Sequence, residues 1–248
     1  MVSATEAAPP LRVGTDEWPP YEYTGPDGTV TGFSTDVVRA VMDELGMAYG
    51  EIQVLPWARA EAMAFSGELD VLFSASHSDR RLEHCYFPDE PLIESPNVLF
   101  IRAEDKDRLR FDALADLRGH TVGIVRDYAY TPEFLDFVKA NVDHSVALDD
   151  ASNFKLLSRG RVDYIPADLG NGLAMIDQMG LAGKIIPLRN HPIKTSGIYA
   201  MFSKKTVKPP TVRQFSKALA EFRKTPEYQR LYDRYFGDRR VGAGPAAE

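Results

Sequence analysis

Short apolar runs alternate along the chain with longer segments whose apolar residues recur at helical spacing. The runs of strand type are 11–14, 52–55, 71–73, 98–101, 120–125, 164–166, 185–187 and 198–202. The segments of helical type are 33–45, 57–66, 152–157, 169–179, 212–222 and 226–236. Because the two kinds of segment alternate instead of separating into blocks, the pattern predicts an α/β fold.

Residue types at segment ends indicate where two of the helices begin. Ser34 or Thr35 is expected to cap the first helix, since a hydroxyl at this place can accept from the free backbone N–H groups. Thr131 and Pro132, followed by Glu133, supply a capping hydroxyl, a proline at the first helical position and an early acid. The second pattern predicts a helix that starts at Pro132.

Two stretches of the chain share one layout. Residues 62–76 and 154–168 each run from a helix end through a glycine and a hydrophobic-Asp turn into an apolar strand. The first strand leads into polar residues 74–81, and the second leads to Asp168. In an open α/β sheet, ligands bind beyond the carboxyl ends of strands. Two lobes that present such ends to a common cleft would set a cation opposite an anion.

Composition narrows the class of protein. The 248 residues are 44% hydrophobic and 26% charged, as in an ordinary globular protein, with a net charge of −7 and a pI near 5.3. This acidic balance argues against nucleic acid or an anionic membrane surface as a partner. The single cysteine, Cys85, excludes an internal disulfide and a thiolate metal cluster, and no cofactor or metal motif is present.

The two ends of the chain give weaker signals. The start, MVSATEAAPP, has neither a basic region nor an apolar core, so it is not an intact signal peptide. It fits a mature secreted start with an added Met, or a native cytosolic start. The last residues, GDRRVGAGPAAE, are small and polar and are expected to form a disordered tail.

The stretch 70–92 carries the strongest chemical signal. Its apolar strand runs into three hydroxyl residues, Ser74, Ser76 and Ser78, and then into the adjacent arginines Arg80 and Arg81. Hydroxyl donors backed by a fixed guanidinium can hold a small carboxylate through charge-assisted hydrogen bonds. A solvated charged turn is the simpler explanation for one arginine, but the two related strand ends favour an anion site.

The loop after the first strand holds three aromatic residues among prolines and glycines. Trp18, Tyr21 and Tyr23 are expected to form either a stacking wall for a ligand or a lid over the core. Three aromatic residues within six positions of a loop favour the first interpretation.

The order of these motifs resembles family 3 of the periplasmic solute-binding proteins, which capture polar amino acids for ABC importers. The resemblance covers residues 11 to about 237 and rests on GTDEWPPYEY, DGTVTGFSTDVVRAVMDELG, PWARA, GELDVLFSASHSDRR, ADLRGHTVGIV, SRGRVDYIPAD and YQRLYDRYFG. It implies an α/β, two-lobed periplasmic-binding-protein fold with two hinge crossovers and a ligand cleft between the lobes. On this pattern residues 1–93 form the first part of lobe 1, residues 94–199 form lobe 2, and residues 200–248 complete lobe 1.

The resemblance also implies roles for individual residues. The family pattern gives the ligand carboxylate to an arginine, here Arg81 because of its spacing to Phe87, with help from Ser74, Ser76 and Ser78. It gives the ligand ammonium to Asp168. It places Asp16, Trp18 and Tyr21 at the ligand side chain or its stacking wall, and Trp57, less strongly Arg59, in the side-chain pocket.

One position departs from the family pattern. Many members carry Gly-Thr or Gly-Ser after the lobe 2 strand, whereas this chain has Asp127-Tyr128-Ala129. An acid and a ring in place of a hydroxyl are compatible with a different or larger ligand that stacks on Tyr128. The ligand class expected is therefore a small polar or zwitterionic solute, an amino acid or a related carboxylate.

The resemblance implies a monomer without enzyme activity that works in the periplasm, or lipid-anchored outside the cytoplasm, with the signal peptide removed. Its partners would be a small-molecule ligand and the inner-membrane permease of an ABC transporter. Two alternatives stay open. Dehydratases of the cyclohexadienyl type share the fold and would use Asp168 as a general acid, and sensor domains use the fold in front of signalling modules.

Overall fold

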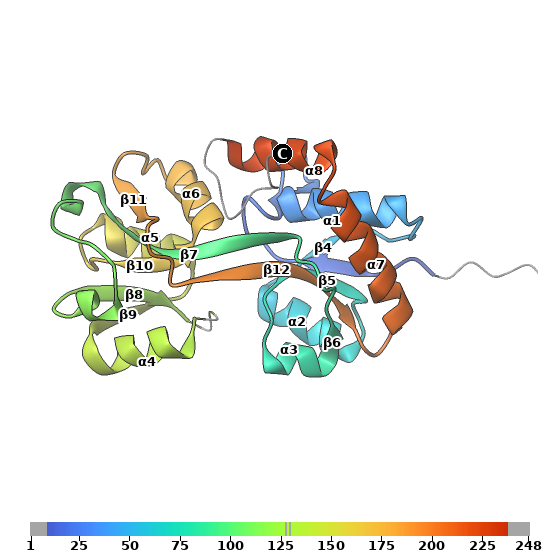
Figure 1. Cartoon of the computed structure of the whole chain (residues 1–248), viewed down its shortest axis with the longest axis horizontal. Helices are drawn as coiled ribbons and strands as arrows, with labels where there is room; N and C mark the ends of the chain where they lie inside the picture. The colour runs from blue at the N-terminus through green and yellow to red at the C-terminus, as the bar shows by residue number, and fades with distance from the viewer. Residues whose placement is uncertain (1–8, 127, 129, 238–248) are drawn as a thin grey trace, which may run out of the picture. The chain divides into compact units, whose positions relative to one another are not determined.

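The structure is a computed structural model, and it describes residues 9–126, 128 and 130–237. Strands and helices alternate along it, so the predicted α/β class is confirmed (Figure 1). The strands are β1 (Val13–Thr15), β2 (Tyr23–Thr24), β3 (Val30–Thr31), β4 (Gln53–Val54), β5 (Val71–Ala75), β6 (Cys85–Tyr86), β7 (Ile93–Arg102), β8 (Thr121–Val125), β9 (Asp143–Ala147), β10 (Ile165–Asp168), β11 (Ile185–Leu188) and β12 (Lys194–Ser203). The α-helices are α1 (Phe33–Glu44), α2 (Trp57–Ser66), α3 (Asp79–His84), α4 (Pro132–Asn141), α5 (Asp150–Ser158), α6 (Leu169–Gln178), α7 (Pro209–Phe222) and α8 (Pro226–Phe236), and two 3-10 turns are η1 (Ala103–Asp105) and η2 (Leu114–Leu117).

The chain divides into two compact units. Unit 1 combines the chain up to Ile93 with the chain from Gly197 onward, and unit 2 is Glu94–Ser196. The chain therefore passes from one unit to the other twice, near the start of β7 and within β12. Tyr199, which the sequence assigns to lobe 2, lies in unit 1.

Unit 1 is built on a sheet in the order β12-β5-β1-β4. Strands β5, β1 and β4 are parallel, with Val13 opposite Val71 and Gly14 opposite Gln53, whereas β12 is antiparallel to β5. Because β1 and β5 run in the same direction, their carboxyl ends lie at one edge of the sheet. The residues that follow these two strands are therefore brought to the same edge.

Helices from the two ends of the chain pack together in unit 1, where Figure 1 shows α7 and α8 beside α1. The fully buried ring of Phe33, the first residue of α1, lies 5.5 Å from the ring of Tyr228 and 5.2 Å from that of Phe236 in α8. Aromatic pairs at such distances add to the stability that apolar burial supplies. The last predicted helix thus closes the core of unit 1.

The predicted cap of α1 was wrong. Gly32 occupies the N-cap position with φ of 125°, and neither Ser34 nor Thr35 caps the helix, since both lie inside it and are fully buried. A Cβ on Gly32 would lie 2.3 Å from the carbonyl oxygen of Tyr21. The close approach of this loop requires glycine at the helix start, and sequence pattern alone does not show that approach.

The predicted start of α4 is confirmed. The Thr131 hydroxyl accepts from the backbone N–H of Phe134 at 3.3 Å, and Pro132 is the first helical residue. By contrast, α3 was not predicted, because six residues that include four charged side chains show no apolar periodicity.

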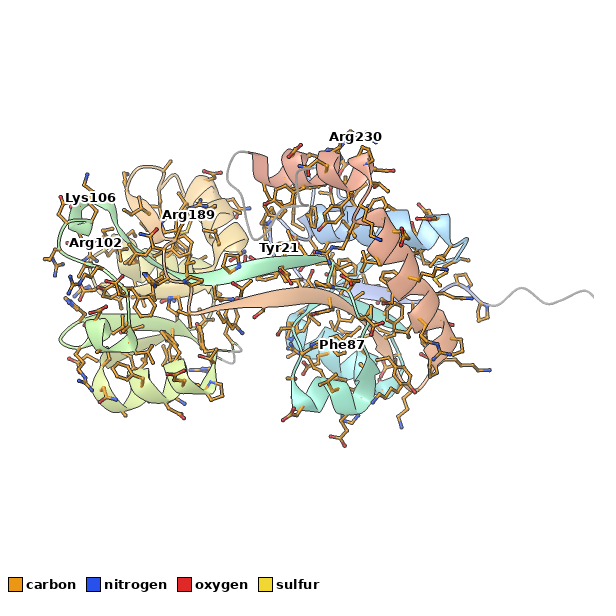
Figure 2. The ribbon with its side chains drawn as sticks, viewed as in Figure 1. Tyr21, Phe87, Arg102, Lys106, Arg189 and Arg230 are labelled. Atoms are coloured by element: carbon orange, nitrogen blue, oxygen red, sulfur yellow. The ribbon has the colours of Figure 1, made fainter. Side chains whose placement is uncertain are left out.

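Unit 2 contains a three-stranded antiparallel arrangement in which β7 pairs with both β10 and β11, and a parallel pair of β8 and β9. Phe134 from α4 lies in its apolar core with Leu99, Val122 and Tyr164. Figure 2 labels Arg102 at the end of β7, whose guanidinium is 2.7 Å from Asp105 and 3.1 Å from Asp163. Unit 2 therefore has its own apolar core and its own partly buried ion-pair cluster.

Candidate functional site

The edge of the sheet in unit 1 holds the arginine that the sequence favours. The buried strand β5 ends at Ala75, and Ser78 then caps α3 by accepting from the backbone N–H of Arg81 at 3.3 Å. This cap starts the short helix that carries Arg81. Ser78 therefore acts on the backbone of the arginine in this structure.

The Arg81 guanidinium is held in place by three contacts. Its Nη1 donates to the carbonyl oxygen of Ser76 at 2.9 Å and to the Ser76 hydroxyl at 3.0 Å, and its Nε donates to Glu61 Oε1 at 2.8 Å. Its face covers the ring of Trp57, 4.9 Å from the ring centroid. Within the part of the chain that the structure describes, Nη2 donates to no protein group. The protein thus fixes the edge of the guanidinium that carries Nε and Nη1, and Nη2 on the other edge is available to a ligand.

Arg80 has a different environment. Its side chain is 71% exposed, against 14% for Arg81, and its Nη1 lies 3.4 Å from Glu61 Oε2. Its guanidinium lies over Phe65 at 5.2 Å. An exposed pair of this kind is worth little and holds the side chain loosely. Of the two adjacent arginines, Arg81 is the ordered one.

Ser74 is bonded to an acid that the sequence did not single out. Its backbone has φ of 66°, and its hydroxyl donates to Glu22 Oε2. Glu22 has no exposed surface, and burial raises the pKa of its carboxyl well above the ordinary value, which the Ser74 hydrogen bond opposes. Ser74 thus has a partner within the protein.

Asp16 directly follows β1 and lies beside Glu22. Burial raises the pKa of Asp16 to about 6, while its own backbone N–H, the Glu22 carboxyl and the charge of Arg81 act in the opposite direction. Asp16 is therefore half ionised near pH 6, and its charge is in the field of Arg81.

Two of the three aromatic residues of the loop differ in their burial. Tyr21 is fully buried, 5.7 Å from the ring of Phe236, and Figure 2 labels it within unit 1. Trp18 is partly exposed and lies 4.7 Å from Tyr21, centroid to centroid. The structure thus places Tyr21 in the core and leaves the surface position of this loop to Trp18.

In unit 2, two acids, Asp168 and Asp150, lie close together at the end of β10. Asp168 is 8% exposed and caps α6, accepting from the backbone N–H of Asn171 at 3.0 Å. Tyr128, 44% exposed, donates to Asp150 Oδ2 at 2.7 Å. Asp127 and Ala129, the other residues of the predicted departure, lie outside the described residues.

Asp150 carries a perturbed carboxyl. Burial raises the pKa of Asp150 to about 6, the Tyr128 hydrogen bond lowers it, and the charges of Asp168 and Asp149 raise it. Two adjacent acids, Asp150 and Asp168, give this part of unit 2 a negative potential that favours a positively charged group.

The sequence pattern did not predict three acids that contact the candidate site residues, Glu22, Glu61 and Asp150. Glu61 could have been found, because it lies four positions after Trp57 and hence on the same face of α2. Glu22 and Asp150 gave no signal, since the burial that perturbs them comes from residues distant in the sequence.

Among the described residues there is neither a group of metal ligands nor a helix able to cross a membrane. In residues 9–126, 128 and 130–237, no three His, Cys, Asp or Glu side chains gather as metal ligands. No helix in these residues combines the length and apolar character needed to cross a membrane. A groove of about 600 Å³ in unit 2, lined in part by Phe111, Phe134 and Ile193, includes none of the predicted ligand residues.

The fold class is that of the two-lobed periplasmic binding proteins. A solved histidine kinase sensor domain with similarity to periplasmic binding proteins matches at a TM-score of 0.75 and 25% identity, over 92% of this chain and 96% of that chain. An ancestral arginine-binding protein, solved with arginine, matches at a TM-score of 0.74 and 23% identity, over 92% of this chain and 98% of that chain. The predicted two-lobed fold is therefore confirmed.

The sequence comparison gives the family. The profile of the bacterial extracellular solute-binding proteins, family 3, matches residues 11–238, so the chain belongs to this family. The L-cystine-binding protein TcyJ of Escherichia coli (strain K12) is 24% identical over 233 residues, which are 92% of this chain and 82% of that protein. The family that the motif order indicated is thus confirmed.

Proposed function

We propose that this protein binds a small zwitterionic solute, an amino acid or a related carboxylate, outside the cytoplasm and delivers it to the permease of an ABC importer. The observation that carries the proposal is the guanidinium of Arg81, which Glu61, Ser76 and Trp57 hold rigidly while Nη2 has no partner among the described residues. Membership in a family of extracellular solute-binding proteins supports the same function.

The carboxylate of the solute is assigned to Arg81. A guanidinium whose orientation is fixed loses little conformational entropy when it binds a carboxylate, and its bonds to an anion are charge-assisted. Ser76 and Ser78 contribute through Arg81, because one accepts from its guanidinium and the other caps its helix. Ser74 and Trp57 complete the surroundings of the carboxylate.

The ammonium group is assigned to Asp168. A desolvated zwitterion needs an anion for its ammonium as well as a cation for its carboxylate, or its burial is unfavourable. Asp168 is nearly buried, and the adjacent Asp150 strengthens the negative potential there. Tyr128, with its exposed ring, is assigned a stacking contact. Trp18, which packs on the buried Tyr21, is assigned the wall beside Asp16.

A panel of solutes tests the ligand class. L-Cystine and L-arginine are included because relatives are named for these ligands, with L-glutamine, L-glutamate and simple carboxylates beside them. A ligand at 100 times its Kd stabilises the folded state by about 2.7 kcal/mol, which a thermal-shift measurement detects readily. Failure of every member to raise the melting temperature would count against amino-acid binding.

The paired arginines supply a matched control for the site. Arg81→Ala is expected to weaken binding of the identified ligand at least a hundredfold, because a charge-assisted contact to the carboxylate is lost. Arg80→Ala is expected to change Kd less than threefold, since its exposed side chain takes no part in the site. Isothermal titration calorimetry measures both, and the reverse order would remove Arg81 from this role.

Two alternatives have direct tests. Conversion of prephenate or arogenate to an aromatic product would indicate a dehydratase. The similarity to a kinase sensor domain favours sensing as the second candidate function. Genes for a permease and an ATPase beside the gene for this protein would support import over sensing.

A further inference from the structure

A β-bulge near the end of β5 sets the direction of the side chains that follow it. Phe73 pairs with Ala200 of β12, and Ala75 pairs with Tyr199, the preceding residue of that strand. Ser74 is therefore an extra residue in β5, and its φ of 66° marks the same irregularity. Because successive side chains of a strand point to opposite faces, one extra residue reverses the faces of all those beyond it.

This reversal decides which residue beyond β5 meets the ring of Tyr199. His77, two positions after Ala75, turns to the face of Tyr199, and Ser76 turns to the opposite face. A ladder without the extra residue would set Ser76 against Tyr199 and turn His77 away. In the structure the imidazole of His77 lies on the Tyr199 ring, and the Ser76 hydroxyl accepts from Arg81.

Two aromatic rings hold the imidazole of His77. Its centroid is 4.2 Å from that of Tyr199 with an interplanar angle of 20°, and Phe87 lies edge-on to it at 4.5 Å. His77 is otherwise exposed, so these rings fix its position more than the core does. Partial burial lowers the pKa of His77 from its ordinary value, so the stack at pH 7.5 is between neutral rings.

The ring of Tyr199 lies back along its own strand. A Cβ on Gly197 would be 2.6 Å from both Cζ and Oη of Tyr199. Residues two positions apart share one face of a strand, so the missing side chain at Gly197 leaves the room that the Tyr199 ring occupies. Gly197 begins the part of β12 that belongs to unit 1, and the whole stack lies within this unit.

We propose that His77 and Tyr199 are positioning residues for the carboxylate site, and that their stack holds the segment 76–78 in the form that orients Arg81. The proposal rests on the proposed function and extends it to residues that do not touch the solute. Ser76 accepts from Nη1 of Arg81, and Ser78 accepts from the backbone N–H of the same residue. Because His77 lies between these two serines, a fixed His77 ring restricts both acceptors.

NMR of the arginine side chains tests this positioning without a ligand. While Ser76 binds Nη1, rotation about the Nε–Cζ bond is hindered, so the two Nη nitrogens of Arg81 are expected to give separate nitrogen-15 signals. The exposed Arg80 is expected to give one averaged signal. His77→Ser is expected to merge the Arg81 signals, and His77→Phe, which keeps a ring, to leave them separate. Merged Arg81 signals in the wild type or in His77→Phe, or separate signals in His77→Ser, would overturn the proposal.

His84→Ser is the matched control. The His84 ring lies 4.5 Å from that of Phe65 at the other end of α3, so this variant removes a similar contact outside the segment 76–78. It is expected to leave the Arg81 signals separate, and their merging would show a general loosening of α3 and contradict the proposal. Tyr199→Leu removes the second ring of the stack and is expected to merge the signals, so it decides the matter if His77→Ser does not fold.

Calorimetric titrations at pH 7.5 with L-arginine, L-glutamine and L-cystine connect the stack to binding. For a solute that binds, His77→Ser is expected to raise Kd about three- to tenfold, as for the loss of one aromatic contact, and His77→Phe and His84→Ser by less than about twofold. An unchanged Kd in His77→Ser would show that the stack does not prepare the site. If none of the three binds to the wild type while the NMR signals are as expected, the proposed function is at fault and the positioning of Arg81 stands.

Discussion

At the scale of single residues, hydroxyls and carboxyls in both units act on other protein groups before any ligand is present. Ser76 and Ser78 hold Arg81, Ser74 holds Glu22, and Tyr128 holds Asp150. A site whose polar groups are already oriented by neighbours binds with a smaller entropy cost than one whose groups must be ordered by the ligand. These bonds therefore prepare the two proposed charge contacts.

The buried acid of unit 2 predicts a pH-dependent stability. Because the pKa of Asp150 is raised to about 6, the folded state binds more protons than the unfolded state between about pH 4 and pH 6, and stability due to this group falls as pH rises through that window. Asp150→Asn is expected to raise the free energy of unfolding at pH 7.5 by about 1–2 kcal/mol and not at pH 4. Urea unfolding at both pH values measures the difference from wild type.

Tyr128→Phe is the control for this prediction. Its hydroxyl favours the ionised Asp150, so removing it is expected to lower stability at pH 7.5 by about 1 kcal/mol and to have less effect at pH 4. An equal effect of Asp150→Asn at both pH values would show that Asp150 titrates normally.

At the scale of elements, the two stretches with a shared layout use their aspartates in the same way. Asp70 accepts from the backbone N–H of Arg12 at 2.8 Å, and Asp163 accepts from that of Thr121 at 3.1 Å. Each carboxylate thus binds the start of a neighbouring strand, β1 in unit 1 and β8 in unit 2. The turn that precedes each apolar strand therefore fixes the position of the strand that lies beside it, β1 in unit 1 and β8 in unit 2.

The start of α1 provides a test at this scale. Gly32→Ala is expected to cost about 3 kcal/mol or more in stability, because φ of 125° is unfavourable for a side chain and the new Cβ meets the backbone of Tyr21. Gly28→Ala is the control, with φ of 81° and no atom within 4 Å of the added Cβ, and is expected to cost about 1 kcal/mol. Chemical unfolding of both variants measures the difference, and equal costs would mean that the loop moves away without penalty.

At the scale of the whole molecule, each unit has its own apolar core. Phe134 lies in the core of unit 2 and Phe33 in that of unit 1, packed against α8. Because the chain passes between the units twice, unit 2 is one continuous segment, whereas unit 1 is assembled from both ends of the chain and is completed by the terminal helices.

Separate cores predict separate responses to core substitutions. Phe134→Ala is expected to cost about 3–5 kcal/mol and to speed hydrogen exchange mainly at amides of unit 2, whereas Phe33→Ala does the same for unit 1. Hydrogen-exchange mass spectrometry reads both units in one experiment. Equal acceleration in both units by either variant would show that the two cores open as one.

The sequence by itself determined the α/β class, the order of most elements, the Thr131 cap and the family, because these depend on local periodicity, turn residues and motif order. It also distinguished Arg81 from Arg80 by spacing, and the two arginines differ in their contacts. Only the tertiary structure decided that Gly32 caps α1, that Tyr21 lies in the core, and that Glu22, Glu61 and Asp150 act on the neighbouring polar groups. Burial and the pKa of an acid are set by groups that folding brings close from distant parts of the chain.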